Sequence, residues 1–208
     1  MISAREALER LREGNRRFAS DTPNDALATQ SRRKALAAGQ APFAIILGCS
    51  DSRVPAELVF DQGLGDLFVI RVAGNIVAPS QIGSVEYAAE RFGTRLVVVL
   101  GHSQCGAVAA TLEELMRPTD KQSRNLASIV NRIRPSVEAL LKTAARHDSE
   151  ALVDEAVRSN VRVSADHLRH GSEILEQLIE TNGLLVVGAE YSLDTGIVDF
   201  FDGVPGGG

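Results

Sequence analysis

Four short aliphatic segments constrain most strongly what this chain of 208 residues can fold into. They span residues 43–47, 67–72, 96–100 and 184–187. None of them alternates polar with apolar residues, which is typical of strands buried on both faces of a parallel sheet. Helical patterns separate most of these segments, and residues 197–201 can return as an edge strand. We therefore expect an α/β fold with a mainly parallel β-sheet of four strands plus a C-terminal edge strand, flanked by helices.

The first expected helix begins with a capping box at Ser3 and Glu6 and carries a narrow apolar stripe of Leu8, Leu11 and Phe18. Because the rest of this helix is mostly charged, we expect the stripe to lie across another surface instead of inside its own core. Further helices are expected over residues 32–38, 80–92, 107–116, 123–141 with an interruption at Pro135, 149–168 and 172–181.

No internal repeat or linker divides the chain. Residues 1–208 are therefore expected to form a single α/β domain, with an N-terminal helical arm over residues 1–38 and a flexible tail over residues 203–208.

Charge and hydropathy exclude several function classes. The chain carries 22 Lys and Arg against 27 Asp and Glu, a net charge of -5, and its longest basic run is residues 32–34. Binding to nucleic acid through phosphate contacts is therefore not expected. The longest purely aliphatic runs are too short to span a membrane. The first residues show no apolar segment of an export signal, so we expect a cytoplasmic protein.

Two cysteines stand at the ends of expected strands. Cys49 follows the first strand, and Cys105 follows the third, three residues after His102. Ligands of open parallel sheets bind outside the carboxyl ends of the strands, where the strand order reverses, so these three side chains are expected to meet there. Two thiolates and one imidazole form a catalytic zinc set with one tetrahedral position left open.

Other interpretations of the cysteines stay open at this point. Each can be a small buried residue with no chemical role. A redox pair is less consistent with the sequence, because it contains no Cys-x-x-Cys. A cysteine phosphatase loop would need Cys and Arg six residues apart, whereas Cys49 and Arg53 are only four apart.

Asp51 and Arg53 add a second element beside Cys49. A bidentate pair with Arg53 would hold the Asp51 carboxylate ionised. In that state Asp51 can accept a hydrogen bond from metal-bound water and orient it. Released from Arg53, it can take the fourth metal position and close the site.

These motifs resemble the two signatures of the β-class carbonic anhydrases. The first is Cys-Ser-Asp-Ser-Arg at residues 49–53, and the second is Gly-His-Ser-x-Cys-Gly at residues 101–106. The resemblance covers most of the chain and is tightest over residues 40–106. It implies Zn²⁺ bound by Cys49, His102 and Cys105, and reversible hydration of carbon dioxide to bicarbonate and a proton by zinc-bound hydroxide.

The resemblance also implies the substrate pocket and the assembly. Gln40, Phe68, Tyr87 and the backbone amide of Gly106 match positions that border or face the substrate. Several pocket residues come from the neighbouring subunit in this family, across which the N-terminal helices wrap. We therefore expect a homodimer or a dimer of dimers, with carbon dioxide and bicarbonate as its small-molecule partners and neither nucleic acid nor a membrane.

Two departures from the family pattern bear on regulation and pocket shape. One subclass has a tryptophan three residues before the first zinc ligand, as part of a non-catalytic bicarbonate site. This chain has Ile46 there and contains no Trp, so it resembles the subclass that lacks this site. Residues 71–75 also differ from the plant-like pattern, so the pocket wall near Ala73 is not defined by the resemblance.

Two other functions are compatible with the same motifs. A sibling enzyme on this scaffold would hydrolyse carbonyl sulfide or carbon disulfide, and a non-catalytic module would bind zinc or respond to bicarbonate. The intact pair of Asp51 and Arg53 argues against the second, because a purely structural metal site has no use for it. The remaining histidines (His147, His167 and His170) lie in polar helical stretches and are expected to be solvated.

Overall fold

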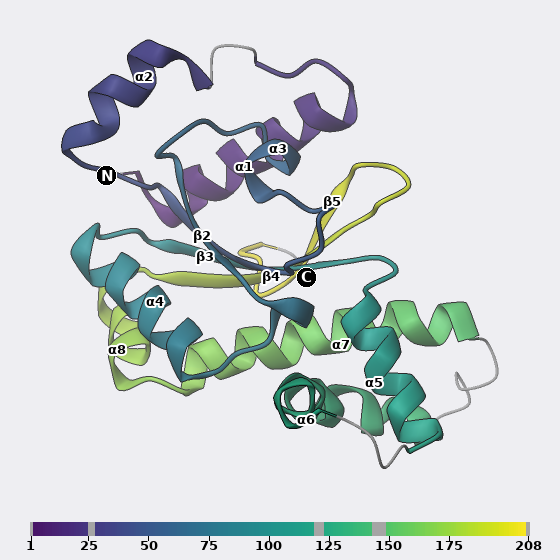
Figure 1. Cartoon of the computed structure of the whole chain (residues 1–208). Helices are drawn as coiled ribbons and strands as arrows, with labels where there is room; N and C mark the ends of the chain where they lie inside the picture. Colours follow the sequence, from purple (N-terminus) through teal and green to yellow (C-terminus); the bar gives the residue numbers. More distant parts are fainter. Residues whose placement is uncertain (1, 25–27, 119–122, 143–148, 207–208) are drawn as a thin grey trace.

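The computed structural model describes residues 2–24, 28–118, 123–142 and 149–206. A five-stranded sheet forms its centre, with helices on both faces (Figure 1). The strands are β1 (Ala44–Gly48), β2 (Leu67–Arg71), β3 (Leu96–His102), β4 (Leu185–Tyr191) and β5 (Val198–Asp202). Their order is β2-β1-β3-β4-β5; the first four are parallel, and β5 is antiparallel to β4. The expected α/β fold and edge strand are confirmed.

Strand order explains where a site can form. The chain leaves β1 towards one side, to β2, and leaves β3 towards the other, to β4. The carboxyl ends of β1 and β3 are therefore adjacent at the point where the strand order reverses, which leaves a crevice between the two crossovers. β1 and β3 are buried along their whole length, because apolar layers cover both of their faces.

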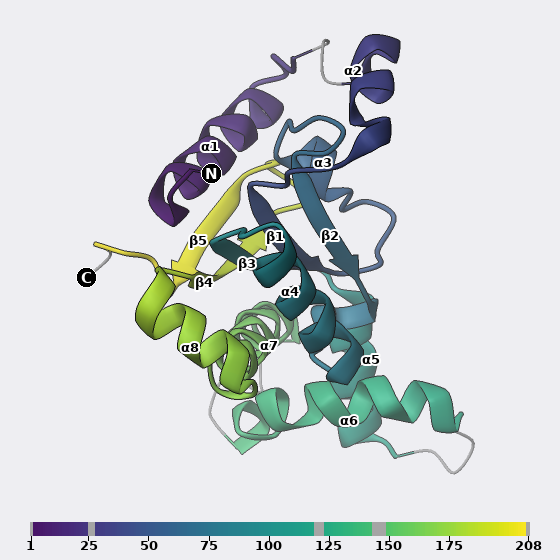
Figure 2. The same cartoon turned by 90° about the vertical axis from the view of Figure 1, so that its left-hand side faces the viewer.

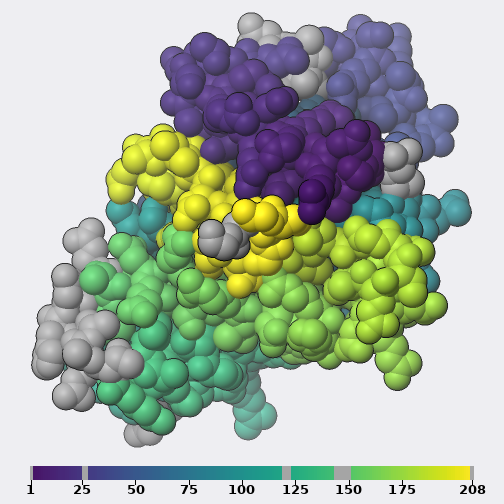
Figure 3. All heavy atoms as spheres, turned by 180° about the vertical axis from the view of Figure 1, so that it is seen from behind, coloured from purple at the N-terminus to yellow at the C-terminus, as the bar shows by residue number. Residues whose placement is uncertain are grey.

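Helix α1 (Ala4–Ala19) and the short α3 (Ala56–Val59) cover one face of the sheet. The capping box at Ser3 and Glu6 is present. Leu8 and Leu11 are buried in the core between α1 and the sheet of their own chain. The expectation that this stripe lies across another surface is therefore wrong, and Figure 3 shows the N-terminal helix directly against the C-terminal segment.

Asn15 supplies the physical reason for this placement of α1. Its side-chain amide donates to the carbonyl oxygens of Val59 and Gly196, and its side-chain oxygen accepts from the N–H of Val198. A buried polar side chain with all these partners fixes one docking position for the helix.

The opposite face carries α4 (Pro79–Arg91), α7 (Ser149–His170) and α8 (Glu173–Asn182). Helices α5 (Gly106–Met116) and α6 (Arg124–Glu138) pack against α7 at the end of the sheet where the cysteines lie (Figures 1 and 2). Helix α2 (Gln30–Ala35) buries none of its residues. Single 3-10 turns cover Leu36–Ala38, Ala73–Asn75 and Leu140–Lys142.

The interruption expected at Pro135 is wrong, because α6 continues through it to Glu138. Proline removes one hydrogen bond, to the carbonyl four residues earlier, but it lies in the last turn of the helix. Buried neighbours hold that turn: the Ser136 hydroxyl donates to the Ile133 carbonyl, and the Ser159 hydroxyl of α7 donates to the Ser136 carbonyl.

The expected tail is described only over residues 203–206, where Val204 packs against the α1 face of the core; residues 207–208 lie outside the described residues, as does His147. His167 and His170 are exposed, as expected. Among the helices of the described ranges, none combines the length and the apolar composition needed to cross a bilayer.

Candidate metal centre

Cys49, His102 and Cys105 converge at the carboxyl edge of the sheet, as the sequence predicts. Cys49 directly follows β1, His102 is the last residue of β3, and Cys105 is the N-cap of α5. The two strands pair in parallel, with Gly48 opposite Leu100. One ligand atom from each of the three side chains lies within 4.8 Å of the other two, and all three residues are buried.

The hydrogen bonds of His102 define which of its nitrogens is available. Nδ1 lies 2.9 Å from the carbonyl oxygen of Ser103. A carbonyl can only accept, so Nδ1 carries the proton and the lone pair is on Nε2. Nε2 is fully buried and has no hydrogen-bond partner among the described residues. A buried nitrogen lone pair beside two thiols is the donor set that fits Zn²⁺, and the backbone carbonyl behind it orients the ring.

Hydrogen bonding at Cys49 favours the thiolate. The thiol of Cys105 has the largest effect in lowering the pKa of Cys49, against the effect of burial, and the backbone N–H of Gly74, 3.3 Å from Sγ, lowers it further. The same shared hydrogen bond, together with burial, raises the pKa of Cys105. The two sulfurs thus share one proton between them, and a bound cation would take its place.

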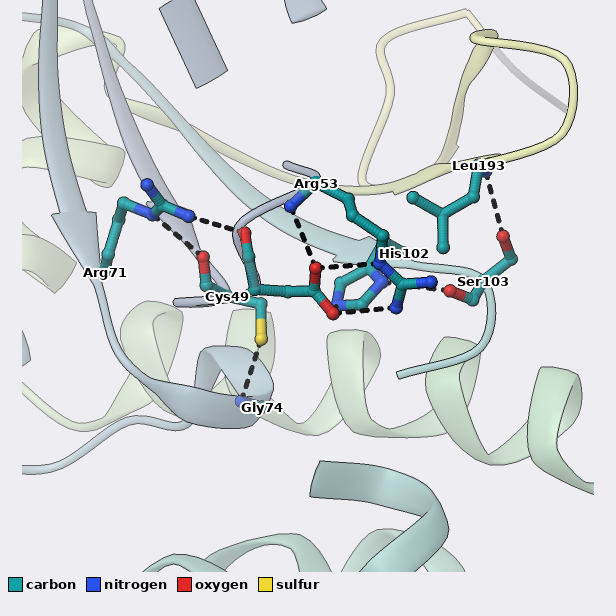
Figure 4. Close-up of polar contacts among 8 residues, drawn as sticks. Cys49, Arg53, Arg71, Gly74, His102, Ser103 and Leu193 are labelled. Carbon is teal, nitrogen blue, oxygen red and sulfur yellow. Dashed lines mark hydrogen bonds and ion pairs between the residues drawn. The ribbon is translucent and has the colours of Figure 1, made fainter. Parts of the chain in front are cut away.

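Asp51 is held by Arg53 through both carboxylate oxygens. Arg53 Nε donates to Oδ1 at 3.0 Å, and Nη2 donates to Oδ2 at 2.8 Å (Figure 4). This pairing holds the pKa of Asp51 well below its usual range. The Oδ2 atom lies 3.9 Å from His102 Nε2, so the ionised carboxylate borders the metal centre.

Arg71 is a functional residue that the sequence reasoning missed. It ends β2 opposite Gly48, and its guanidinium donates to the carbonyl oxygens of Cys49 at 3.0 Å and Asp51 at 2.6 Å (Figure 4). The loop after β1 is therefore fastened from the neighbouring strand. The feature of the sequence that could have indicated this role is an arginine at the end of an otherwise apolar strand.

A hydrogen bond from Asn160 holds the turn at Gly74 in place; we call this contact the clamp. Gly74 has a φ of 70°, and its carbonyl accepts a hydrogen bond of 2.8 Å from the side-chain amide of Asn160 on α7. A Cβ at Gly74 would lie 2.7 Å from Ile133 Cδ1, so both its backbone conformation and its packing favour glycine. The signal that sequence reasoning missed is Asn160, a buried amide between the core residues Val157 and Val161.

The structure places the four expected substrate residues in two groups. Gly106 begins α5 next to Cys105, and its missing side chain leaves open space at the helix N-terminus. Gln40 is exposed before the amino end of β1, away from the cysteines. Phe68 lies opposite Ile45 on the edge strand β2, where it contacts the half-exposed ring of Tyr87 with 6.2 Å between centroids. These three residues are not brought to the metal centre of their own chain.

Comparison with known proteins gives one consistent result. A family model described as carbonic anhydrase matches residues 44–198. Carbonic anhydrase 2 of Mycobacterium tuberculosis is 40% identical over 190 residues, which cover 91% of this chain and 89% of the relative. The carbonic anhydrase of Mycolicibacterium smegmatis is 37% identical, covering 93% and 91%.

Solved structures agree with these relatives. A chain from the crystal structures of two tetrameric β-carbonic anhydrases of Sordaria macrospora superimposes with a TM-score of 0.72 at 26% identity, covering 81% of this chain and 85% of that one. The Coccomyxa β-carbonic anhydrase in complex with acetazolamide gives a TM-score of 0.71 at 25% identity, covering 91% and 83%.

Proposed function

The chain belongs to the β-class carbonic anhydrases, enzymes of reversible carbon dioxide hydration, and from this premise we propose how its own residues perform the reaction. Cys49, His102 and Cys105 hold Zn²⁺, Asp51 orients the attacking water, and Arg53 fixes Asp51. The observation that carries this proposal is the unpartnered, buried Nε2 of His102 beside two sulfurs, with the Asp51 carboxylate 3.9 Å away.

Cys49, His102 and Cys105 would supply the three protein ligands of a catalytic zinc site, and water would take the remaining position. Zinc, when bound, lowers the pKa of coordinated water to roughly 7 in the three-histidine carbonic anhydrases, from which this value is taken, and so supplies a nucleophile at neutral pH.

Asp51 does the orienting. Because Arg53 keeps it ionised, the carboxylate can only accept a hydrogen bond, so the O–H of the nucleophile points to Asp51 and its lone pair is free to face the substrate. With both carboxylate oxygens paired to Arg53, Asp51 is not free to serve as a metal ligand. Closure of the site by Asp51 requires that this ion pair first open.

The backbone N–H of Gly106 lies in the first turn of α5, where helix N–H groups have no carbonyl partner within the helix. We propose that it donates to the substrate oxygen as negative charge develops there. The open space that its missing side chain leaves keeps this approach free.

Gln40, Phe68 and Tyr87 complete the pocket of a second subunit. Phe68 pairs with Ile45, four residues before Cys49, which places it about 13 Å along the sheet from its own metal centre. Tyr87 is 54% exposed next to the edge strand β2. This aromatic pair at a sheet edge, in which Phe68 is partly buried and Tyr87 exposed, supports a homodimer or a dimer of dimers, as do the tetrameric relatives from Sordaria macrospora.

The Trp-containing bicarbonate site is proposed to be absent. Ile46, at the corresponding position, is fully buried in β1 and part of the α1 face of the core, so its side chain is enclosed within this subunit.

Stopped-flow measurement of carbon dioxide hydration, with zinc content determined on the same sample, tests the proposed function. We expect zinc near one per chain and activity at neutral and mildly alkaline pH. Zinc near one per chain with no hydration at any pH from about 6 to 9 would overturn the proposal. Hydrolysis of carbonyl sulfide on the same sample is the control, and faster turnover of that substrate would favour the sibling activity.

A further inference from the structure

A cavity of about 440 Å³ opens between the N-terminal end of α4 and helices α6 and α7. The three helices lie together on the same side of the sheet in Figures 1 and 2. Its lining is mainly apolar: Val77, Ala78, Pro79, Ile82, Pro135 and Val163. This volume and this lining are typical of sites for small molecules. None of the residues of the metal centre lines it.

Ser164 supplies a hydroxyl group to the cavity wall. Ser164 lines the cavity and is only 4% exposed, yet its hydroxyl makes no hydrogen bond to any described residue. In helices, serine and threonine hydroxyls commonly donate a hydrogen bond to the carbonyl oxygen one turn earlier, as those of Thr111 and Ser84 do in this protein. The Ser164 hydroxyl, which leaves this bond unmade, is free to bond to a molecule that enters the cavity.

The lining carries one formal charge, the guanidinium of Arg132. Arg132 and His167 lie on the cavity wall and are exposed, while no acidic residue lines the cavity. Within the described ranges Arg132 makes one hydrogen bond, from Nη1 to the Ser128 carbonyl of its own helix. Its remaining donors are available. A cavity whose lining carries a guanidinium and no carboxylate is complementary to an anion.

The positions of these groups suit a carboxylate. Ser164 and His167 are three residues apart on α7, so they share one face of that helix. Arg132 comes from α6, and a guanidinium pairs a carboxylate in a bidentate manner. The apolar lining from α4 and Val163 then remains for a hydrocarbon body.

We propose that this cavity binds a small monocarboxylate with a short aliphatic chain. The aliphatic part of the ligand packs on Val77, Ile82 and Val163. Its carboxylate accepts hydrogen bonds from Arg132, His167 and Ser164. The site is separate from the metal centre, and it extends the chemistry of the protein beyond carbon dioxide and bicarbonate.

Sodium hexanoate is the probe, added to the zinc-loaded full chain labelled with nitrogen-15. We expect saturable shifts of the backbone amides of Ala78, Ile82 and His167 in proton–nitrogen correlation spectra, and weaker shifts with hexanol or acetate. Arg132→Glu should weaken binding by about tenfold or more. Arg124→Glu, an exposed arginine on the same helix outside the cavity, is the matched control for charge and should bind as the wild type does.

Val163→Trp fills the cavity from its rim and should abolish these shifts, and because Val163 is 38% exposed the fold tolerates the larger side chain. Shifts confined to residues around Cys49, Asp51 and Gly106 would mean that hexanoate binds only at the metal, and would overturn the proposal. Equal binding by Arg132→Glu and the wild type would overturn it too. The spectrum of the wild type alone decides whether the cavity is the site, even if a variant fails to fold.

Discussion

Arg71 holds the main chain of Asp51, with 2.6 Å between its Nη2 and the Asp51 carbonyl oxygen, while Arg53 holds the side chain of the same residue. One arginine at the end of β2 and one in the turn after β1 thus fix a single residue, by its main chain and by its carboxylate. Such double support keeps the carboxylate in place beside the metal centre without any ligand present.

Removing the charge of Asp51 should separate orientation from metal binding. In Asp51→Asn the residue keeps its size but can also donate a hydrogen bond, so the nucleophile is no longer oriented. We expect zinc content near that of the wild type and a loss of about a hundredfold or more in kcat for hydration. Stopped-flow rates and metal analysis check this. Loss of zinc in the variant would instead mean that Asp51 is chiefly a ligand.

Arg71→Gln should loosen the loop that carries Cys49. The variant cannot donate to both the Cys49 and the Asp51 carbonyl oxygens, so the first ligand and the orienting carboxylate lose a common support. We expect zinc affinity to fall by about 10- to 100-fold, measured by competition with a chelator. Arg91→Gln, in the last turn of α4, removes a charge without this contact and serves as the control. Unchanged affinity in Arg71→Gln would contradict the role assigned to Arg71.

Asn160→Ala should expose the importance of the clamp on Gly74. The substitution leaves the buried carbonyl of Gly74 without its donor, which costs about 1–3 kcal/mol in the free energy of unfolding. Urea denaturation measures this cost. Asn125→Ala, at an exposed position of α6, should change stability little. Equal effects of the two substitutions would show that the clamp contributes nothing specific.

Two glycine substitutions test the docking of α1 on its own chain. In Gly14→Ala the new Cβ would lie 1.8 Å from the carbonyl oxygen of Phe60, so α1 must move, at a cost of about 1–3 kcal/mol. In Gly83→Ala, within α4, the new Cβ meets nothing within 4 Å, and higher helix propensity should stabilise the protein by about 0.5–1 kcal/mol. Thermal or urea unfolding shows whether each substitution lowers or raises the free energy of unfolding. A neutral Gly14→Ala would mean that α1 does not pack on Phe60 in solution.

Glu190 should make stability depend on pH. Burial raises its pKa above the ordinary 4.5, although Arg158 pairs with it at 3.0 Å. Between the unfolded and the folded pKa the folded protein binds the proton more tightly, so the free energy of unfolding falls as pH rises through this window. Glu190→Gln cannot ionise and should lose this trend. Unfolding curves at a series of pH values check it, and a constant difference between variant and wild type contradicts it.

Those parts of the fold that rest on local periodicity could be predicted from the sequence. The strands and the three ligands follow from aliphatic runs and from what stands directly after them. The four-residue helix α3 was missed because it is too short to show a period. The course of α6 through Pro135 and the docking of α1 depend on buried contacts of Ser136 and Asn15, which involve distant residues.

The supports of the metal centre were harder to predict than its ligands. Arg71 and Asn160 act through backbone carbonyl oxygens, which every residue has, so no motif records their partners. The family resemblance assigns Gln40, Phe68 and Tyr87 to the substrate pocket, but within one chain these residues lie away from the metal centre. The structure of a single chain therefore does not test this assignment.

The pairing of β1 with β3 also determines when the three side chains of the candidate metal centre can meet. Cys49 is synthesised about 50 residues before His102 and Cys105, and the three meet only after a non-local strand pairing, which is a slow event in folding. Until then Cys49 is a lone thiol on a nascent chain, open to oxidation or to binding by other metals. Assembly of the candidate metal centre is therefore a late step of folding, which depends on the completed sheet and on what protects that thiol during translation.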